Sequence, residues 1–124
     1  MEINFSKVLG HIKSKGCDKM ACIGFCWGVW YSFKMSAKHD CFKAIACPHP
    51  SLGVEGIFGG KPAALAEQVK CPAFLMPANN DPEDVREKGE ITEILAKRFG
   101  KEQTGCVFFE DMVHGWTTRG DFSD

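Results

Sequence analysis

The sequence lacks the features that mark several large classes of protein. No block of like charge appears in its 124 residues, and 15 lysines and arginines against 16 aspartates and glutamates give a net charge of −1. Nucleic-acid grooves and polybasic membrane patches need concentrated positive potential, so we expect no nucleic-acid partner. No apolar run approaches the roughly 20 residues that span a bilayer, and the first residues lack the layout of a signal peptide. We therefore expect a cytoplasmic protein with no membrane partner.

Closely spaced cysteine pairs of the CxxC type are also missing. The seven cysteines stand at positions 17, 22, 26, 41, 47, 71 and 106. Structural zinc sites show two closely spaced ligand pairs, and disulfide frameworks suit small secreted chains, so we expect neither, and no metal. Most of these cysteines are expected to be reduced and buried as small apolar residues. The length and the 44% hydrophobic content suit a single domain over residues 1–124.

What the sequence does contain is an alternation of helical and strand-like segments. The expected helices cover residues 3–14, 27–37, 63–69 and 85–99, and the expected strands cover residues 20–23, 42–47, 73–76 and 106–109. We expect loops over residues 51–62 and after residue 109. Short apolar strands alternating with helices predict an α/β fold, a parallel sheet of about four strands with helices on both faces.

Polar residues follow directly after each of the four predicted strands. They are Cys26, His49, Asp81 and His114, in chain order. Because the carboxyl ends of parallel strands meet at one edge of the sheet, and ligands bind at that edge, these residues indicate a site. For His49, which lies between two prolines, both a place in the pocket and a structural role stay open.

Residues 24–28, Gly-Phe-Cys-Trp-Gly, have the form of a nucleophile elbow, with Cys26 in the place of the usual serine. In such an elbow the nucleophile sits on a sharp turn from strand to helix, and side chains two residues before or after it would collide with the backbone. The helix N-terminus favours the thiolate, and the N–H of Trp27 would face a developing oxyanion. A structural thiol at a tight turn is the alternative explanation of Cys26.

The order of Asp81 and His114 along the chain indicates a functional role for both residues. Taken alone, Asp81 suits an Asx turn or the N-cap of the next helix, and His114 suits a surface group. The order of nucleophile, acid and histidine, each after a different strand, is that of the α/β-hydrolases. In acyl transfer the acid fixes the imidazole tautomer and the imidazole moves the proton.

At these positions the sequence resembles the dienelactone hydrolases, a carboxymethylenebutenolidase-like branch of the α/β-hydrolase superfamily. Residues 23–28 are close to the elbow of that family, residues 78–81 resemble its acid loop, and residues 114–116 resemble its histidine loop. The resemblance implies that Cys26 is the nucleophile, Asp81 the acid and His114 the base. It also implies the opening of lactones and the cleavage of activated esters, with neither a metal nor an organic cofactor.

The resemblance covers the second half of the family pattern, so a partial α/β-hydrolase fold is expected. The leading hypothesis is a hydrolase that cleaves a small ester or lactone through an acyl-cysteine intermediate, with Phe25, Trp116 and Arg119 as substrate-binding residues. The first alternative is a truncated, non-catalytic remnant of such a hydrolase, which would self-associate through an exposed sheet edge. The second alternative is a redox sensor that uses the thiol of Cys26.

Overall fold

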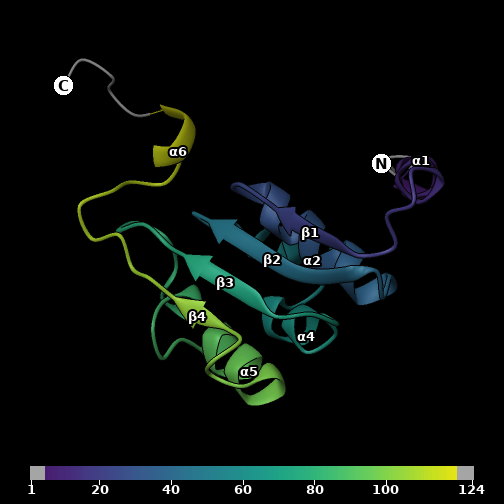
Figure 1. Ribbon diagram of the computed structural model, residues 1–124. Coiled ribbons are helices and arrows are strands. Elements are labelled where there is room, and N and C mark those ends of the chain that lie inside the picture. Colours follow the sequence, from purple (N-terminus) through teal and green to yellow (C-terminus); the bar gives the residue numbers. More distant parts are fainter. Residues whose placement is uncertain (1–4, 120–124) are drawn as a thin grey trace.

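The computed structural model describes residues 5–119 (Figure 1). The strands are β1 (Met20–Ile23), β2 (Phe42–Pro48), β3 (Ala73–Met76) and β4 (Gly105–Cys106). The α-helices are α1 (Phe5–Ser14), α2 (Trp27–Lys38), α3 (Val54–Ile57), α4 (Pro62–Ala66), α5 (Glu90–Phe99) and α6 (Trp116–Arg119), and a 3₁₀ turn, η1, covers Glu83–Val85. No helix among the described residues is long and apolar enough to cross a bilayer.

The four strands form one parallel sheet, as the sequence predicts, and their order across the sheet is β1-β2-β3-β4. The register pairs Ile23 with Ala46, Ala46 with Phe74, and Phe74 with Gly105. Because all four strands run in the same direction, their carboxyl ends lie at one edge of the sheet. In Figure 1 this edge faces the long loop that leads to α6.

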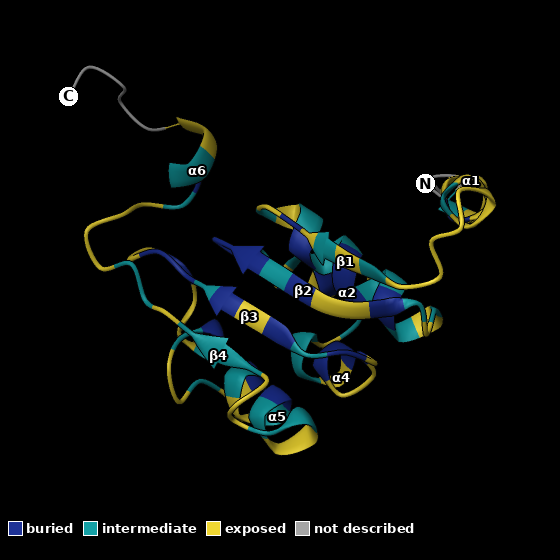
Figure 2. Ribbon diagram, viewed as in Figure 1, coloured by how far each residue is buried: buried dark blue, intermediate teal, exposed yellow. Residues whose placement is uncertain are grey.

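The parallel α/β sheet expected from the sequence is confirmed, and helices α2, α4 and α5 pack on one of its faces. The exposed side chains of the opposite face correct the expectation that helices cover both. Helix α4 contacts both α2 and α5. In Figure 1, α2 lies behind β1 and β2, and α4 and α5 lie below β3 and β4. On the opposite face the side chains of Ala21, Ile23, Ala44 and Phe74 are exposed, as the yellow segments of the strands in Figure 2 show. The sequence predicts strands buried on both faces, but exposed residues alternate with partly buried ones in β1, and Phe74 is exposed between two buried residues in β3.

The hydrophobic core lies between the sheet and the helices behind it. Phe33 of α2, Leu75 of β3 and Ile91 of α5 are fully buried there. Helix α1 joins the core at its margin, where the ring of Phe5 stacks on that of Phe42 with centroids 5.9 Å apart. The core therefore fixes α2 against β1 and β2, which positions the turn between β1 and α2.

The structure corrects several predicted element boundaries. The predicted helix over residues 85–99 is divided into η1 and α5, because the chain turns at Lys88, whose φ is 61°. The predicted strand over 106–109 pairs regularly only at β4, and its continuation makes an isolated bridge between Phe109 and Ala78. Helices α3 and α6 lie in segments expected to be loops. Helix α4 ends three residues before the predicted end at Val69.

Candidate active site

The elbow between β1 and α2 has the sharp geometry that its sequence predicts. Cys26 adopts φ 55° and ψ −125°, a left-handed conformation that is rare for residues with a side chain. A Cβ on Gly24 would lie 2.5 Å from the carbonyl oxygen of Gly28, so only glycine fits at that position. A Cβ on Gly28 would meet open space, which corrects the expectation that both glycines avoid a collision.

This difference between the two glycines predicts a difference in stability. Gly24→Ala is expected to lower the free energy of unfolding by about 2–3 kcal/mol, because backbone atoms must move to admit the methyl group. Gly28→Ala is expected to leave it unchanged or raise it by up to about 1 kcal/mol, since alanine favours helices. Urea unfolding followed by circular dichroism measures both changes. An equal decrease in the free energy of unfolding of both variants would contradict the packing described for Gly24.

The three residues predicted to act together meet within hydrogen-bonding distance. His114 Nε2 lies 3.1 Å from Cys26 Sγ, and His114 Nδ1 lies 2.6 Å from Asp81 Oδ1. The Asp81 side chain is 2% exposed and that of His114 25% exposed, so the acid is buried while the imidazole reaches the surface. The sulfur, the imidazole and the carboxylate thus form a continuous chain that runs from surface to interior.

The acid loop is held by backbone hydrogen bonds and by Arg86. Asp81 Oδ2 accepts a hydrogen bond of 2.7 Å from the N–H of Ala78, which leaves Oδ1 to His114. The guanidinium of Arg86 donates to the carbonyl oxygens of Asp81 and Asn79. Asp81 thus closes a turn, which is one of the two structural roles predicted for it. The other role, the N-cap of the next helix, belongs to Gly89 at the start of α5. The turn and the contact with His114 use different oxygens of the same carboxylate.

The loop that carries His114 is attached to the acid loop. Asn80 Oδ1 accepts a hydrogen bond of 2.6 Å from the N–H of His114, and the N–H of Asn79 donates to the carbonyl of Met112 over 2.9 Å. Beyond the histidine, the ring of Trp116 stacks on that of Phe109 with centroids 4.7 Å apart. These contacts fix the imidazole relative to Asp81.

His49 lies beside the three residues and supports them. It is 1% exposed, its Nε2 lies 2.6 Å from Thr117 Oγ1, and its ring meets that of His114 edge-on at 4.9 Å between centroids. Its φ is 37°, so the chain turns sharply between the two prolines. The sequence allowed either a place in the pocket or a structural role for His49, and the structure favours a buried structural role next to the site.

The residues predicted to bind substrate gather near the same histidines. The rings of Phe25 and Trp116 both lie close to His49, with centroid distances of 6.1 and 6.2 Å. Arg119 is exposed, at the end of α6, one helical turn beyond Gly115. Its positive charge is among the influences that lower the pKa of His49, after burial and the charge of His114.

Sequence reasoning missed one member of the cluster, Ser51. Its Oγ lies 3.5 Å from Cys26 Sγ and 3.4 Å from His114 Nε2. No motif marks this serine, because it follows His49 and Pro50 in a segment that reads as the start of a loop. The one available signal was its position just beyond a strand end, at the edge where the other polar residues collect.

The electrostatics of the site favour charge separation between sulfur and imidazole. Burial, the largest single influence, raises the pKa of the Cys26 thiol, but hydrogen bonds with Ser51, His114 and the N–H of Trp27 together lower it below its usual value. Burial likewise lowers the pKa of His114, and its bonds with Cys26 and Asp81 outweigh burial and raise it. By contrast, burial raises the pKa of Cys106 to about 11. These contacts shift the thiol of Cys26 toward its ionised form and the imidazole of His114 toward its protonated form.

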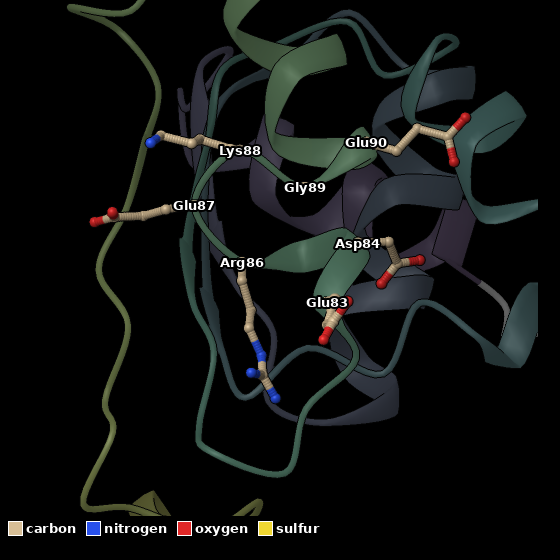
Figure 3. A pocket seen from close by; sticks show the side chains of 7 residues that line it. All are labelled: Glu83, Asp84, Arg86, Glu87, Lys88, Gly89 and Glu90. Carbon is tan, nitrogen blue, oxygen red and sulfur yellow. The ribbon is translucent and has the colours of Figure 1, made fainter.

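An open pocket of about 470 Å³ lies elsewhere, around η1 and the start of α5 (Figure 3). Its side chains diverge, with Glu87 and Lys88 on one side and Asp84 and Glu90 on the other. The carboxylates therefore do not converge on a common point. Among residues 5–119 no group of three or more histidine, cysteine or acidic side chains is placed to hold a metal ion. Arg86 connects this pocket with the acid loop.

A comparison with known protein families shows to which family this chain belongs. The sequence profile of the Dienelactone hydrolase family matches residues 3–123, nearly the whole chain. The chain belongs to the dienelactone hydrolase family. The resemblance carried by the elbow, acid-loop and histidine-loop sequences is thereby confirmed. No curated protein sequence matches this family member.

Solved structures confirm the partial α/β-hydrolase fold of this family member. An acylaminoacyl peptidase of Pyrococcus horikoshii superposes with a TM-score of 0.68 at 17% identity, over 94% of this chain and 24% of that one. A puromycin-hydrolyzing peptidase of Mycobacterium tuberculosis gives 0.66 at 19% identity, over 87% and 21%. A candidate dienelactone hydrolase of Klebsiella pneumoniae gives 0.64 at 20% identity, over 88% and 48%. The chain thus spans from about a fifth to about half of the length of these structures.

Proposed function

We propose that this dienelactone hydrolase family member cleaves small carboxylic esters or lactones through an acyl-cysteine intermediate. The observation that carries the proposal is the chain of contacts from Cys26 Sγ to His114 Nε2 at 3.1 Å and from His114 Nδ1 to Asp81 Oδ1 at 2.6 Å. This geometry supports the proposal, because acyl transfer uses a nucleophile, a base and an orienting acid connected in this order. The family relationship supports hydrolysis as the type of reaction.

In the first half of the proposed reaction, the Cys26 thiolate attacks the carbonyl carbon and forms a C–S bond. The N–H of Trp27, in the first turn of α2, has no partner within the helix, and it is available to the resulting oxyanion once the sulfur has given up its charge to the new C–S bond. The C–O bond to the leaving group then breaks, and the imidazolium of His114 gives its proton to the departing oxygen. The product is a thioester on Cys26, with an alcohol released from an ester or retained in the acyl group of a lactone.

In the second half, water replaces the sulfur. His114, now neutral, accepts a proton from water, whose oxygen attacks the thioester carbon, and the C–S bond breaks to release the carboxylic acid and restore the thiolate–imidazolium pair. Asp81 holds the imidazole in one orientation throughout, because its second oxygen is fixed by the N–H of Ala78. The chemistry needs a reduced thiol, and all seven cysteines are free, which supports a reducing compartment such as the cytoplasm.

The surroundings of Cys26 support a small, partly apolar substrate. Phe25 is 43% exposed and Trp27 50% exposed, so both present apolar surface on either side of the nucleophile in sequence. Trp116 closes the histidine loop beside them, and the guanidinium of Arg119 is free to approach an anionic substituent of the substrate. We propose Phe25, Trp116 and Arg119 as the substrate-binding residues on this basis.

The experiment that tests the proposed function combines a rate with the capture of the intermediate. The chain is incubated with a chromogenic short-chain ester, product release is followed, and samples are quenched in acid for mass spectrometry. The expected result is turnover above the protein-free rate, together with an acyl increment on the peptide that contains Cys26. A chain that neither turns over the ester nor acquires the acyl group would overturn the proposal.

We also propose that the chain self-associates along the exposed edge and open face of its sheet. Within residues 5–119, β1 pairs with β2 on one side only, and Ile23 at its end is 63% exposed. An apolar strand with an unpaired edge is a template for pairing with another chain. Size-exclusion chromatography is expected to show a mass above 13.7 kDa that rises with concentration, and Ile23→Lys is expected to reduce it. A concentration-independent monomer would contradict this.

A further inference from the structure

Ser51 completes a triangle of polar atoms at the centre of the site. Its hydroxyl oxygen lies 3.5 Å from Cys26 Sγ and 3.4 Å from His114 Nε2, while these two atoms lie 3.1 Å apart. The serine is therefore in contact with both atoms between which the proton moves. No other serine hydroxyl in the described part of the chain contacts either atom.

The backbone holds Ser51 in this place. The N–H of Ser51 donates to the carbonyl of Cys26 over 3.1 Å, and the N–H of Cys26 donates to the carbonyl of Pro48 over 3.4 Å. The turn at His49, with its positive φ and flanking prolines, leads the chain from β2 back toward the elbow. Ser51 is thus tied to the nucleophile by main-chain bonds and not only by its side chain.

We propose that Ser51 is a further catalytic residue of this site, whose hydroxyl donates a hydrogen bond to the Cys26 thiolate. The inference rests on the proposed function, because it assigns a partner to the nucleophile of that reaction. A thiolate is an acceptor only, so the hydrogen of the Ser51 hydroxyl and the Nε2–H of the His114 imidazolium both point at the sulfur. Together with the N–H of Trp27, these two donors stabilise the charged form of the thiol, since hydrogen bonds to charged groups are stronger than neutral ones.

The hydroxyl has a second role once the sulfur is acylated. The sulfur then carries no charge, and His114 has given its proton to the leaving group, so its Nε2 is an acceptor. The Ser51 hydroxyl, 3.4 Å away, turns to donate to Nε2 until water displaces it there. No proton leaves Ser51 at any step, so the overall reaction stays balanced as ester plus water giving acid plus alcohol.

The other ionisable groups around the sulfur act through His114. Asp81 bonds the far side of the imidazole, and His49 packs against its ring. Arg119 lies farther out, where its charge acts on His49. Ser51 is the one neutral side chain within hydrogen-bonding distance of the sulfur among the described residues, so its removal tests the hydrogen bond without changing the charge of the site.

The test measures the titration of the Cys26 thiol directly. Wild type, Ser51→Ala and Ser51→Thr are alkylated with iodoacetamide between about pH 5 and pH 10, and the modified Cys26 peptide is quantified by mass spectrometry. Ser36→Ala serves as the matched control, because the Ser36 hydroxyl bonds a different thiol, that of Cys71, over 3.2 Å. Circular dichroism confirms that each variant is folded.

The expected result is an inflection for wild type below that of an ordinary thiol. It moves up by roughly one pH unit in Ser51→Ala, and it stays near the wild-type position in Ser51→Thr and Ser36→Ala. An unchanged inflection in Ser51→Ala, beside a low one in wild type, would overturn the role of Ser51 and leave the proposed function intact. An ordinary thiol titration in wild type would overturn both.

Discussion

Replacement of Cys26 by alanine is expected to bring ester hydrolysis down to the rate measured without protein. The loss should reach at least about 10³-fold, because no sulfur remains to attack the ester and no thioester forms. Release of p-nitrophenol from p-nitrophenyl acetate measures the rate, and mass spectrometry after an acid quench should find no acyl increment. The methyl side chain of alanine removes the sulfur without adding bulk to the elbow.

A matched control separates this effect from general thiol reactivity. Cys17 is an exposed cysteine between α1 and β1, and Cys17→Ala is expected to hydrolyse the ester at the wild-type rate. Retention of half or more of the activity in Cys26→Ala would show that another group attacks the ester, and would exclude the acyl-cysteine mechanism at this position. Loss of activity in both variants would point to a reaction of thiols in general.

Replacement of Asp81 by asparagine is expected to lower kcat by about 10³- to 10⁴-fold with little change in fold. The N–H of Ala78 occupies one side of the carboxylate, so an asparagine must turn its carbonyl oxygen there and its NH₂ toward His114. The imidazole then accepts at Nδ1 and carries its proton on Nε2, where it no longer accepts a proton from Cys26. The amide also fails to stabilise the imidazolium.

Steady-state kinetics with the same ester measure this change, and urea unfolding checks the stability of the variant. Asp84→Asn is the matched control, since Asp84 is a half-buried carboxylate three residues away that points into the pocket of Figure 3. It is expected to keep kcat within about twofold. A kcat for Asp81→Asn within a few-fold of wild type would mean that the carboxylate does not orient the base.

The strands could be predicted from the sequence because apolar runs bounded by glycine and proline leave few alternatives. The strand predicted over residues 73–76 is β3, and the strand over 20–23 is β1. Whether helices pack on one face of the sheet or on both could not be predicted in the same way. A run such as Ala73–Met76 is apolar whether one face is packed or two, and only the packing of α2, α4 and α5 on the same side decides it.

The break between η1 and α5 depends on contacts that no helical pattern contains. Residues 85–99 keep apolar side chains at helical spacing throughout, which favours one continuous helix. Instead Lys88 takes a positive φ, and Gly89 comes so close to the carbonyl oxygen of Glu83 that a Cβ would lie 2.3 Å from it. A close approach between backbone segments has no signature in hydrophobic periodicity, so the sequence reading missed it.

At the site, the sequence predicted which groups meet but not everything that holds them. Cys26, Asp81 and His114 each follow a strand, so the parallel topology alone brings them to one edge. Their catalytic roles stay a prediction. Ser51 shows the limit of such reasoning, because it reaches the sulfur through main-chain bonds to the elbow and not through a motif. The position of Ser51 depends on the path of the chain after β2, and secondary-structure propensities do not determine that path.

The left-handed backbone of Cys26 places stability and reactivity in opposition at a single residue. A side chain in this conformation costs of the order of 1–3 kcal/mol, and only the absence of a side chain relieves it. A substitution that relieves the backbone strain at residue 26 therefore also removes the sulfur. Evolution toward higher stability cannot act at this position while the thiol is retained. The compensation must come from neighbours such as Val29 and Phe33, which are fully buried in α2, and tolerance to mutation should be lowest there.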